Sequence, residues 1–204
     1  MSALRHEAMS EAEYLEMEQA SEIKHEYLNG YAYAMAGASD EHNLICAYTL
    51  ANLIFQLRGQ PCSVRPSDMR VKILATGFYT YTDISVVCGE PQFADDEFAT
   101  LLNPVLIVEV LSPSTEMIDR GRKFQHYRQL ESLREYLLIA QDSPRIERFL
   151  RQDDNTWNLA DATGLDASIE LPSIGCTLVL ADVYEKVTFP VDNLGDDSAG
   201  TSHN

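Results

Sequence analysis

The sequence predicts an α/β protein, because segments with strand patterns and segments with helix patterns alternate along the chain. Residues 40–58 place Leu44, Ala47, Ala51 and Ile54 at helical spacing, which indicates a long amphipathic helix. Residues 104–111 form the most apolar strand pattern of the chain, and such a run is typical of a central strand that is buried on both faces.

The remaining elements follow from caps, turns and alternation. Ser10 and Glu13 form a capping box that begins a helix over residues 9–19, and Asn29-Gly30 predicts the turn of a hairpin within 21–36. Residues 89–103 are acidic and are expected to form an exposed loop. Further strands are expected at 62–64, 69–74, 80–87, 134–140, 145–150, 156–159, 169–171 and 176–180, and helices at 116–131 and 181–186.

Length and composition suit one globular domain. The chain has 204 residues, of which 45% are hydrophobic, and we expect a single domain over residues 1–190. The tail 191–204 is rich in Asp, Gly, Ser and Asn and is expected to be disordered. No apolar run is long enough to span a membrane, and the N-terminus lacks the apolar core of a signal peptide, so we expect a cytoplasmic protein.

Charge is distributed unevenly along the chain. The net charge of −17 argues against unspecific binding to nucleic acid, which depends on neutralising phosphates. Residues 115–151 nevertheless carry eight of the fifteen Lys and Arg residues. This basic strip is interpreted either as a salt-bridged helix face or as a positive surface beside a functional site.

Neither the cysteines nor His42 predicts a zinc site. The four cysteines, at positions 46, 62, 88 and 176, contain no Cys-x-x-Cys pair, and without an export signal we expect them to be reduced and structural. His42 lies at the beginning of the long helix, where a histidine is more typical of a cap region than of a metal ligand.

Two carboxylates in apolar strand patterns form the candidate site. Asp83 lies in the segment 81–87 and Glu109 in the segment 105–111. A buried carboxylate is unfavourable unless it is paired or binds a cation, and one divalent cation shared by both residues explains both. The alternatives are that Asp83 caps a strand or turn, and that Glu109 is protonated or pairs with an arginine.

Lys123 follows Glu109 on a predicted helix and completes an acid, acid, lysine order that suits hydrolysis of a phosphodiester with a hard metal ion. Its ammonium would orient the attacking water and stabilise developing negative charge, and the alternative is a surface lysine paired with Asp119. Glu26 is a candidate third carboxylate or an ordinary exposed glutamate, and the Val110 carbonyl is a candidate backbone ligand. Oxygen ligands of this kind favour Mg²⁺ or Mn²⁺.

Several short motifs surround these residues in a fixed order: His25-Glu26-Tyr27 with Asn29-Gly30, Ala34-Met35-Ala36-Gly37 with His42-Asn43, Pro66-Ser67-Asp68-Met69, Asp83-Ile84-Ser85-Val86-Val87-Cys88, Val108-Glu109-Val110-Leu111-Ser112-Pro113-Ser114-Thr115, and Lys123 with Tyr127. Together, over residues 9–187, they resemble the Uma family of bacterial endonucleases, within the PD-(D/E)xK restriction-endonuclease-like superfamily. The resemblance implies a central mixed β-sheet flanked by helices, a divalent metal, and a nuclease site at Glu26, Asp83, Glu109 and Lys123.

Two positions depart from the superfamily pattern. Thr82 replaces a proline that shapes the backbone, and Leu111 stands where a lysine usually follows the glutamate. A nuclease site here therefore depends on Lys123 reaching the carboxylates from its helix.

The leading hypothesis is a Mg²⁺-dependent or Mn²⁺-dependent endonuclease that hydrolyses DNA, and cleavage of two strands favours a homodimer. One alternative is a catalytically silent protein-interaction module with the same fold, since a fold hosts many functions. A second alternative is a nuclease that acts on RNA or on structured DNA ends. Metal binding at the carboxylates separates the first alternative from the other two hypotheses.

Overall fold

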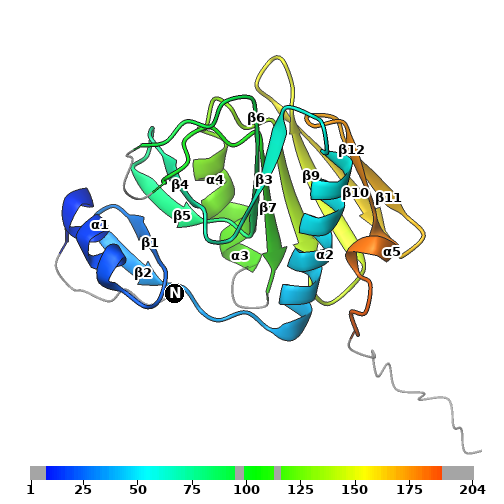
Figure 1. Cartoon of the computed structure of the whole chain (residues 1–204), viewed down its shortest axis with the longest axis horizontal. Coiled ribbons are helices and arrows are strands. Elements are labelled where there is room, and N and C mark those ends of the chain that lie inside the picture. The colour runs from blue at the N-terminus through cyan, green and yellow to red at the C-terminus, as the bar shows by residue number, and fades with distance from the viewer. Residues whose placement is uncertain (1–7, 95–98, 113–115, 190–204) are drawn as a thin grey trace, which may run out of the picture.

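The protein is built around a six-stranded mixed sheet. The computed structural model describes residues 8–94, 99–112 and 116–189. Among these, the strand order is β10-β9-β8-β7-β6-β3, and β7 and β8 form the parallel pair while the other neighbours are antiparallel (Figure 1). The strands span Cys62–Pro66 (β3), Ile84–Cys88 (β6), Leu106–Leu111 (β7), Glu135–Ala140 (β8), Arg145–Arg151 (β9) and Trp157–Thr163 (β10).

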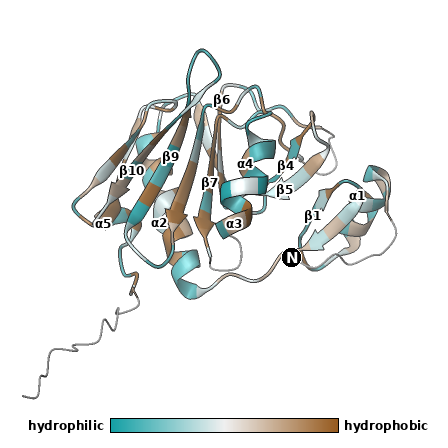
Figure 2. Cartoon of the chain, turned by 180° about the vertical axis from the view of Figure 1, so that it is seen from behind, coloured by the Kyte–Doolittle hydropathy of each residue, from teal (hydrophilic) through white to brown (hydrophobic). Residues whose placement is uncertain are grey.

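Helices and smaller sheets cover both faces of this sheet. One face packs against the long helix α2 (Asp40–Gln56), the short helix α5 (Leu180–Val183) and the β11–β12 hairpin (Ser168–Leu171 and Cys176–Val179). The other face packs against α4 (Phe124–Tyr127), which continues from α3 (Glu116–Ile118) and η1 (Asp119–Lys123). Strand β7 is buried along its whole length, and Figure 2 shows its hydrophobic colour, so its predicted central position is confirmed.

A second sheet of four strands carries the N-terminal part of the chain. Its order is β2-β1-β5-β4, with β1 at His25–Leu28, β2 at Tyr31–Ala34, β4 at Arg70–Ile73 and β5 at Phe78–Tyr81. Helix α1 (Glu11–Ala20) packs on it through Tyr14, whose ring lies 4.8 Å from that of Tyr27. The predicted capping box is present, and the predicted hairpin turns at Asn29 and Gly30, which both have positive φ as a tight two-residue turn requires.

The fold class predicted from the sequence, a central mixed sheet flanked by helices, is confirmed. Two elements differ from prediction. The strand expected over 80–87 is two strands, β5 and β6, which belong to different sheets and are separated by Thr82 and Asp83. The helix expected over 116–131 ends at Tyr127 and contains a five-residue π-helical segment, η1.

The loop expected over 89–103 is only partly exposed. Leu101 is fully buried, its amide donates to the carbonyl of Arg70, and the amide of Lys72 donates to its carbonyl. Thr100 is also buried and its hydroxyl accepts from the guanidinium of Arg70. The predicted exposure was wrong for Thr100 and Leu101. The acidic residues of the segment suggested a solvent-exposed loop, although Leu101 packs in the core.

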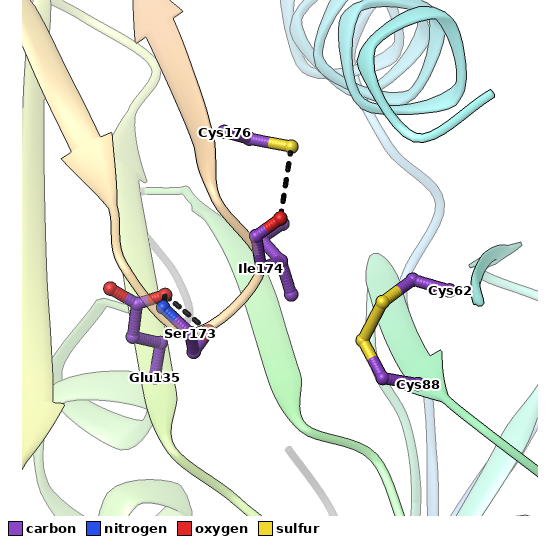
Figure 3. Close-up of a disulfide and its surroundings, with 6 residues drawn as sticks. All are labelled: Cys62, Cys88, Glu135, Ser173, Ile174 and Cys176. Atoms are coloured by element: carbon purple, nitrogen blue, oxygen red, sulfur yellow. Dashed lines mark hydrogen bonds between the residues drawn. A yellow bond between two sulfur atoms is a disulfide. The ribbon is translucent and has the colours of Figure 1, made fainter. Parts of the chain in front are cut away.

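Cys62 and Cys88 form a disulfide, so the expectation of reduced cysteines was wrong for this pair (Figure 3). The two residues lie directly opposite each other on β3 and β6. The flanking amide of Gly89 donates to Pro61, which makes Cys62 and Cys88 a non-hydrogen-bonded pair, the kind in which antiparallel side chains lie closest. Disulfides are uncommon in reducing compartments, so the bridge does not favour the predicted cytoplasmic location, which stays a prediction.

Some predictions fall outside the described residues. The expected tail 191–204 and the motif residues Pro113, Ser114 and Thr115 lie there, and the expected limit of the domain at residue 190 stays a prediction. Within the described part of the chain, no helix is both long and apolar enough to cross a membrane.

Candidate active site

Asp83 lies directly before strand β6, and Glu109 lies on the neighbouring strand β7. β6 and β7 are antiparallel with Ile84 opposite Val108, and continuing this register by one residue puts Asp83 opposite Glu109. Side chains of directly opposed residues leave the same face of a sheet, with Cβ atoms about 5 Å apart. The predicted pair of carboxylates is therefore brought together where the chain passes from one sheet to the other.

Lys123 lies among three carboxylates. Its Nζ is 3.0 Å from Oε1 of Glu26, 3.3 Å from Oε1 of Glu109 and 3.3 Å from Oδ1 of Asp119. All four side chains are buried, with relative exposures between 2% and 6%. One ammonium cannot neutralise three carboxylates, so this acidic cluster (Glu26, Glu109, Asp119 and Lys123) retains an excess of acid.

Three separate elements supply the acidic cluster. Glu26 comes from β1, where the hydroxyl of the opposing Thr80 on β5 donates to its Oε1 at 2.6 Å. Asp119 and Lys123 lie at the two ends of η1, and π-helical turns inside α-helices occur frequently at functional sites. Lys123 therefore reaches Glu109 on β7 from its helical segment. A nuclease site requires this, because Leu111 replaces the lysine that usually follows the glutamate on the strand.

Burial dominates the electrostatics of Glu109. Its removal from water raises the pKa of Glu109 well above the ordinary value, against the lowering effect of Lys123, and the neighbouring Asp119 and Asp83 raise it further. Tyr127, four residues after Lys123, donates its hydroxyl to Oε1 of Glu109 at 2.5 Å. Burial would lower the pKa of Lys123, but Glu109 and the other acids raise it well above its ordinary value and keep the ammonium charged.

Asp83 has different neighbours. Its Oδ2 accepts the amide of Val110 at 2.7 Å and lies 3.3 Å from Nε2 of His42. Burial lowers the pKa of His42, but the hydrogen bond and charge of Asp83, together with Asp119 and the Val110 backbone, raise it above its ordinary value. Nδ1 of the same ring lies 3.6 Å from Sγ of Cys46, and burial strongly raises the pKa of this thiol. The structure thus records a contact from the Val110 amide, and the Val110 carbonyl as a metal ligand stays a prediction.

Sequence reasoning found part of this arrangement. Glu26 is buried in the acidic cluster, so its alternative reading as an exposed residue was wrong. The alternative pairing of Lys123 with Asp119 is present, but the lysine is buried. His42 belongs to the cap region only through its amide, which donates to the Ser39 hydroxyl, while its ring reaches Asp83.

Tyr127, Thr80 and Cys46 were not predicted as site residues. The spacing of four residues between Lys123 and Tyr127, and between His42 and Cys46, was the signal in the sequence for two of these contacts. The contact of Thr80 with Glu26 had no such signal, because it depends on the pairing of β1 with β5.

The basic strip over 115–151 is divided between two roles. Arg120 pairs with Glu116 four residues earlier on the helical segment, so the interpretation as a salt-bridged helix face is confirmed for Arg120. Arg145 lies on β9 instead, and both it and Arg120 pair with Glu147 of that strand. Lys123, from the same strip, lies in the acidic cluster instead. What the site offers chemically is a set of buried carboxylate oxygens with one lysine, and such oxygens are the ligands that hard divalent cations prefer.

Two curated relatives come from a Synechocystis sp. strain. Both are described as uncharacterized proteins. One is 36% identical over 181 residues, covering 89% of this chain and 94% of the relative. The other is 36% identical over 163 residues, covering 79% of this chain and 92% of the relative.

A solved structure has the same fold. It is the crystal structure of a "putative nuclease belonging to DUF820" from Anabaena variabilis, which superposes with a TM-score of 0.65 at 16% identity and covers 80% of this chain and 91% of that one. The sequence model of the Uma2 family, described as "Putative restriction endonuclease", matches residues 11–181. With that match over most of its length, the chain belongs to the Uma2 family.

Proposed function

We propose that this protein is a divalent-metal-dependent endonuclease that hydrolyses phosphodiester bonds in DNA. The observation that carries the proposal is the convergence of Lys123 with Glu26 and Glu109 at 3.0 and 3.3 Å. Asp83 lies beside them, directly before β6, which pairs with the strand that carries Glu109. These residues are far apart in the sequence and come from three elements, β1, β7 and η1, and from the junction of β5 and β6. Family membership supports a nuclease, and the chemistry of the site supports a hard metal.

The donor set fits Mg²⁺ or Mn²⁺. Asp83 and Glu109 would hold the ion, with Glu26 as a third carboxylate and the Val110 carbonyl as a backbone ligand. The raised pKa of Glu109 indicates that this group carries an unfavourable charge that a cation would stabilise. When bound, such a cation supplies positive charge at the scissile phosphate and acidifies water.

Lys123 would position the attacking water. Its ammonium has three protons, and three carboxylates surround it at hydrogen-bonding distance, so it must release at least one of these contacts to reach water or phosphate. A cation bound to Glu109 would weaken the ion pair between Glu109 and Lys123. The lysine would then donate to the developing negative charge on phosphorus oxygens.

One observation favours a catalytically silent interaction module instead. The acidic cluster already contains its own cation, because Lys123 contacts three of the buried carboxylates. A scaffold protein needs no metal there, whereas a nuclease does. Metal binding therefore separates the two functions.

The first test is calorimetric titration of the full chain with Mg²⁺. We expect binding by the wild type, and loss of binding in Asp83→Asn and in Glu109→Gln. Glu90→Gln, which removes the same charge from an exposed glutamate, is the matched control and should bind like the wild type. If the wild type, with its fold verified by circular dichroism, binds no Mg²⁺, the metal-nuclease proposal is wrong and the silent module is favoured.

The second test uses Lys123→Met. Because the lysine competes with the metal for Glu26 and Glu109, we expect the variant to bind Mg²⁺ at least as tightly as the wild type. Cleavage of plasmid DNA should nevertheless be lost, since the variant cannot orient water. Cleavage at the wild-type rate would remove Lys123 from the mechanism, and parallel assays on RNA and on DNA with structured ends identify the substrate class.

We further propose a homodimer, because cleavage of both strands of a duplex calls for two sites related by a two-fold axis. Sedimentation equilibrium of the wild type, with and without duplex DNA, measures this directly. A monomer under both conditions would contradict the dimer and leave a single-strand nick as the expected product.

A further inference from the structure

We propose that His42, Cys46 and Asp83 form a second cation site, one that selects a transition metal of the Zn²⁺ or Co²⁺ type. The site lies where the N-terminal part of α2 contacts Asp83. One ligand atom from each residue, a ring nitrogen, the thiol sulfur and a carboxylate oxygen, lies within 4.8 Å of the others. No part of this assignment depends on the proposed nuclease activity, although the two sites share Asp83.

Helix geometry brings two of the ligands together. His42 and Cys46 are four residues apart on α2, so their side chains leave the same face of the helix. Nδ1 of His42 lies 3.6 Å from Sγ of Cys46. In a tetrahedral zinc site, bond lengths of about 2.0 Å to nitrogen and about 2.3 Å to sulfur separate the two ligand atoms by about 3.5 Å. The observed spacing therefore fits one shared ion.

Asp83 supplies the third ligand from the junction of β5 and β6. Its Oδ2 lies 3.3 Å from Nε2 of His42, and the Val110 amide donates to the same oxygen at 2.7 Å. The imidazole thus lies between the thiol and the carboxylate, with one nitrogen facing each. Because one ligand atom of each residue lies within 4.8 Å of the others, a rotation of the His42 side chain would bring all three ligands to one ion. The Val110 amide fixes the carboxylate, as outer partners of metal ligands do.

A cavity provides access and room for a fourth ligand. It has a volume of about 220 Å³, and Cys46 and Asp83 are among its lining residues, together with Asn43 and Pro66. The side chains of His42 and Asp83 are 14% and 17% exposed, so the site is sheltered but open to solvent. Three protein ligands with an open position for water form the usual arrangement of a non-structural zinc site.

The ligand types decide which cations bind. Thiolate and imidazole prefer Zn²⁺, Co²⁺, Ni²⁺ or Cu²⁺, whereas Mg²⁺ takes oxygen ligands. On binding, the Cys46 thiol releases its proton to solvent and the sulfur forms the bond to the metal. An ion held here withdraws Asp83 from Glu109, so we expect Zn²⁺ to inhibit any Mg²⁺-dependent activity that uses the pair.

Cobalt titration of the metal-free full chain tests the site, since a thiolate bound to Co²⁺ gives a charge-transfer absorption band. The titration is done without reductant, so that the Cys62–Cys88 disulfide stays closed. We expect the band to saturate at one Co²⁺ per chain and to disappear when Zn²⁺ is added. No band in the folded wild type would overturn the proposal.

Matched cysteine variants assign the band. Cys46→Ser should remove it, whereas Cys176→Ser should keep it, because Cys176 is the other free cysteine and its thiol contacts the Ile174 carbonyl elsewhere in the fold (Figure 3). His42→Gln should weaken Co²⁺ binding at least tenfold. If the band survives in Cys46→Ser, or is lost in folded Cys176→Ser, the metal is bound elsewhere and the proposed site at His42, Cys46 and Asp83 is wrong.

Glu109→Gln separates this proposal from the proposed function. It removes a ligand of the Mg²⁺ site but none of the transition-metal site, so we expect the cobalt band to persist while Mg²⁺ binding is lost. A wild type that shows the band but binds no Mg²⁺ would support the second site and contradict the nuclease. The opposite result would contradict the second site alone.

Discussion

At the scale of single residues, Lys123 occupies the position that decides the chemistry of the site. Its ammonium neutralises part of a buried acidic cluster that would otherwise be strongly unfavourable. The lysine therefore stabilises the metal-free protein and, in the proposed mechanism, also serves catalysis. The charged form of Glu109, in contrast, destabilises the metal-free protein, because burial makes the charge unfavourable.

We expect Glu109→Gln to stabilise the metal-free protein above neutral pH. The folded pKa of Glu109 is raised, so the stabilisation from its protonated form is complete below the unfolded pKa and is lost as pH rises through the folded pKa. The glutamine variant has no such loss. Each unit of raised pKa corresponds to about 1.4 kcal/mol in the free energy of unfolding.

Urea unfolding of both proteins across pH in the presence of a chelator measures this effect. The variant should be about as stable as the wild type near pH 4 and more stable at pH 8. A difference that is independent of pH, or a variant that is less stable at pH 8, would contradict the prediction. Glu90→Gln, at an exposed position, should show no such pH-dependent gain.

At the scale of elements, the site depends on how the N-terminal sheet is held. The Ser10 hydroxyl accepts the Glu13 amide, and the Glu13 carboxylate accepts the Ser10 amide at 2.7 Å, so the capping box begins α1. Tyr14 on α1 then donates its hydroxyl to the His25 carbonyl at 2.7 Å. Because β1 also carries Glu26, the helix cap supports the acidic cluster indirectly.

We therefore expect Ser10→Ala to destabilise the N-terminal part locally, by about 1 kcal/mol. Hydrogen exchange should become faster in residues 11–28 and stay unchanged in β7 and β8. Ser143→Ala, which removes an exposed hydroxyl that donates to the adjacent Asp142, is the control. Equal acceleration in β7 would show that the two sheets unfold as one unit and would contradict the local effect.

At the scale of the whole molecule, a disulfide joins the edge strand β3 to β6, the strand that follows Asp83. The bridge between Cys62 and Cys88 closes a sequence separation of 26 residues, and loop entropy alone gives a stabilisation of about 3.5 kcal/mol. Reduction should lower the free energy of unfolding by up to about this amount.

Thiol titration and unfolding curves check the prediction. The denatured chain should expose two reactive thiols without reductant, from Cys46 and Cys176, and four after reduction. A double variant, Cys62→Ala with Cys88→Ala, should unfold identically with and without reductant. Four thiols in the unreduced protein would mean that the bridge does not form in the conditions of purification.

Local patterns predicted much of the fold. The capping box at Ser10, the turn at Asn29-Gly30, the helix over 40–58 and the apolar strand over 104–111 were all readable, because each depends on neighbours within a few residues. The break at Thr82 and Asp83 was not readable. Its flanks are both strand-like, and only the pairing of β5 and β6 with different partners divides them.

The same distinction applies to the site. The sequence by itself determined which residues are candidates for the site. Asp83 and Glu109 are acids in apolar segments, and Lys123 is a lysine on a predicted helix that follows them. Only the tertiary structure decided their contacts. Lys123 contacts three carboxylates, whereas Asp83 contacts His42. Strand register and helix placement bring these residues together from segments that are far apart in the chain. No local sequence pattern encodes contacts between such distant segments.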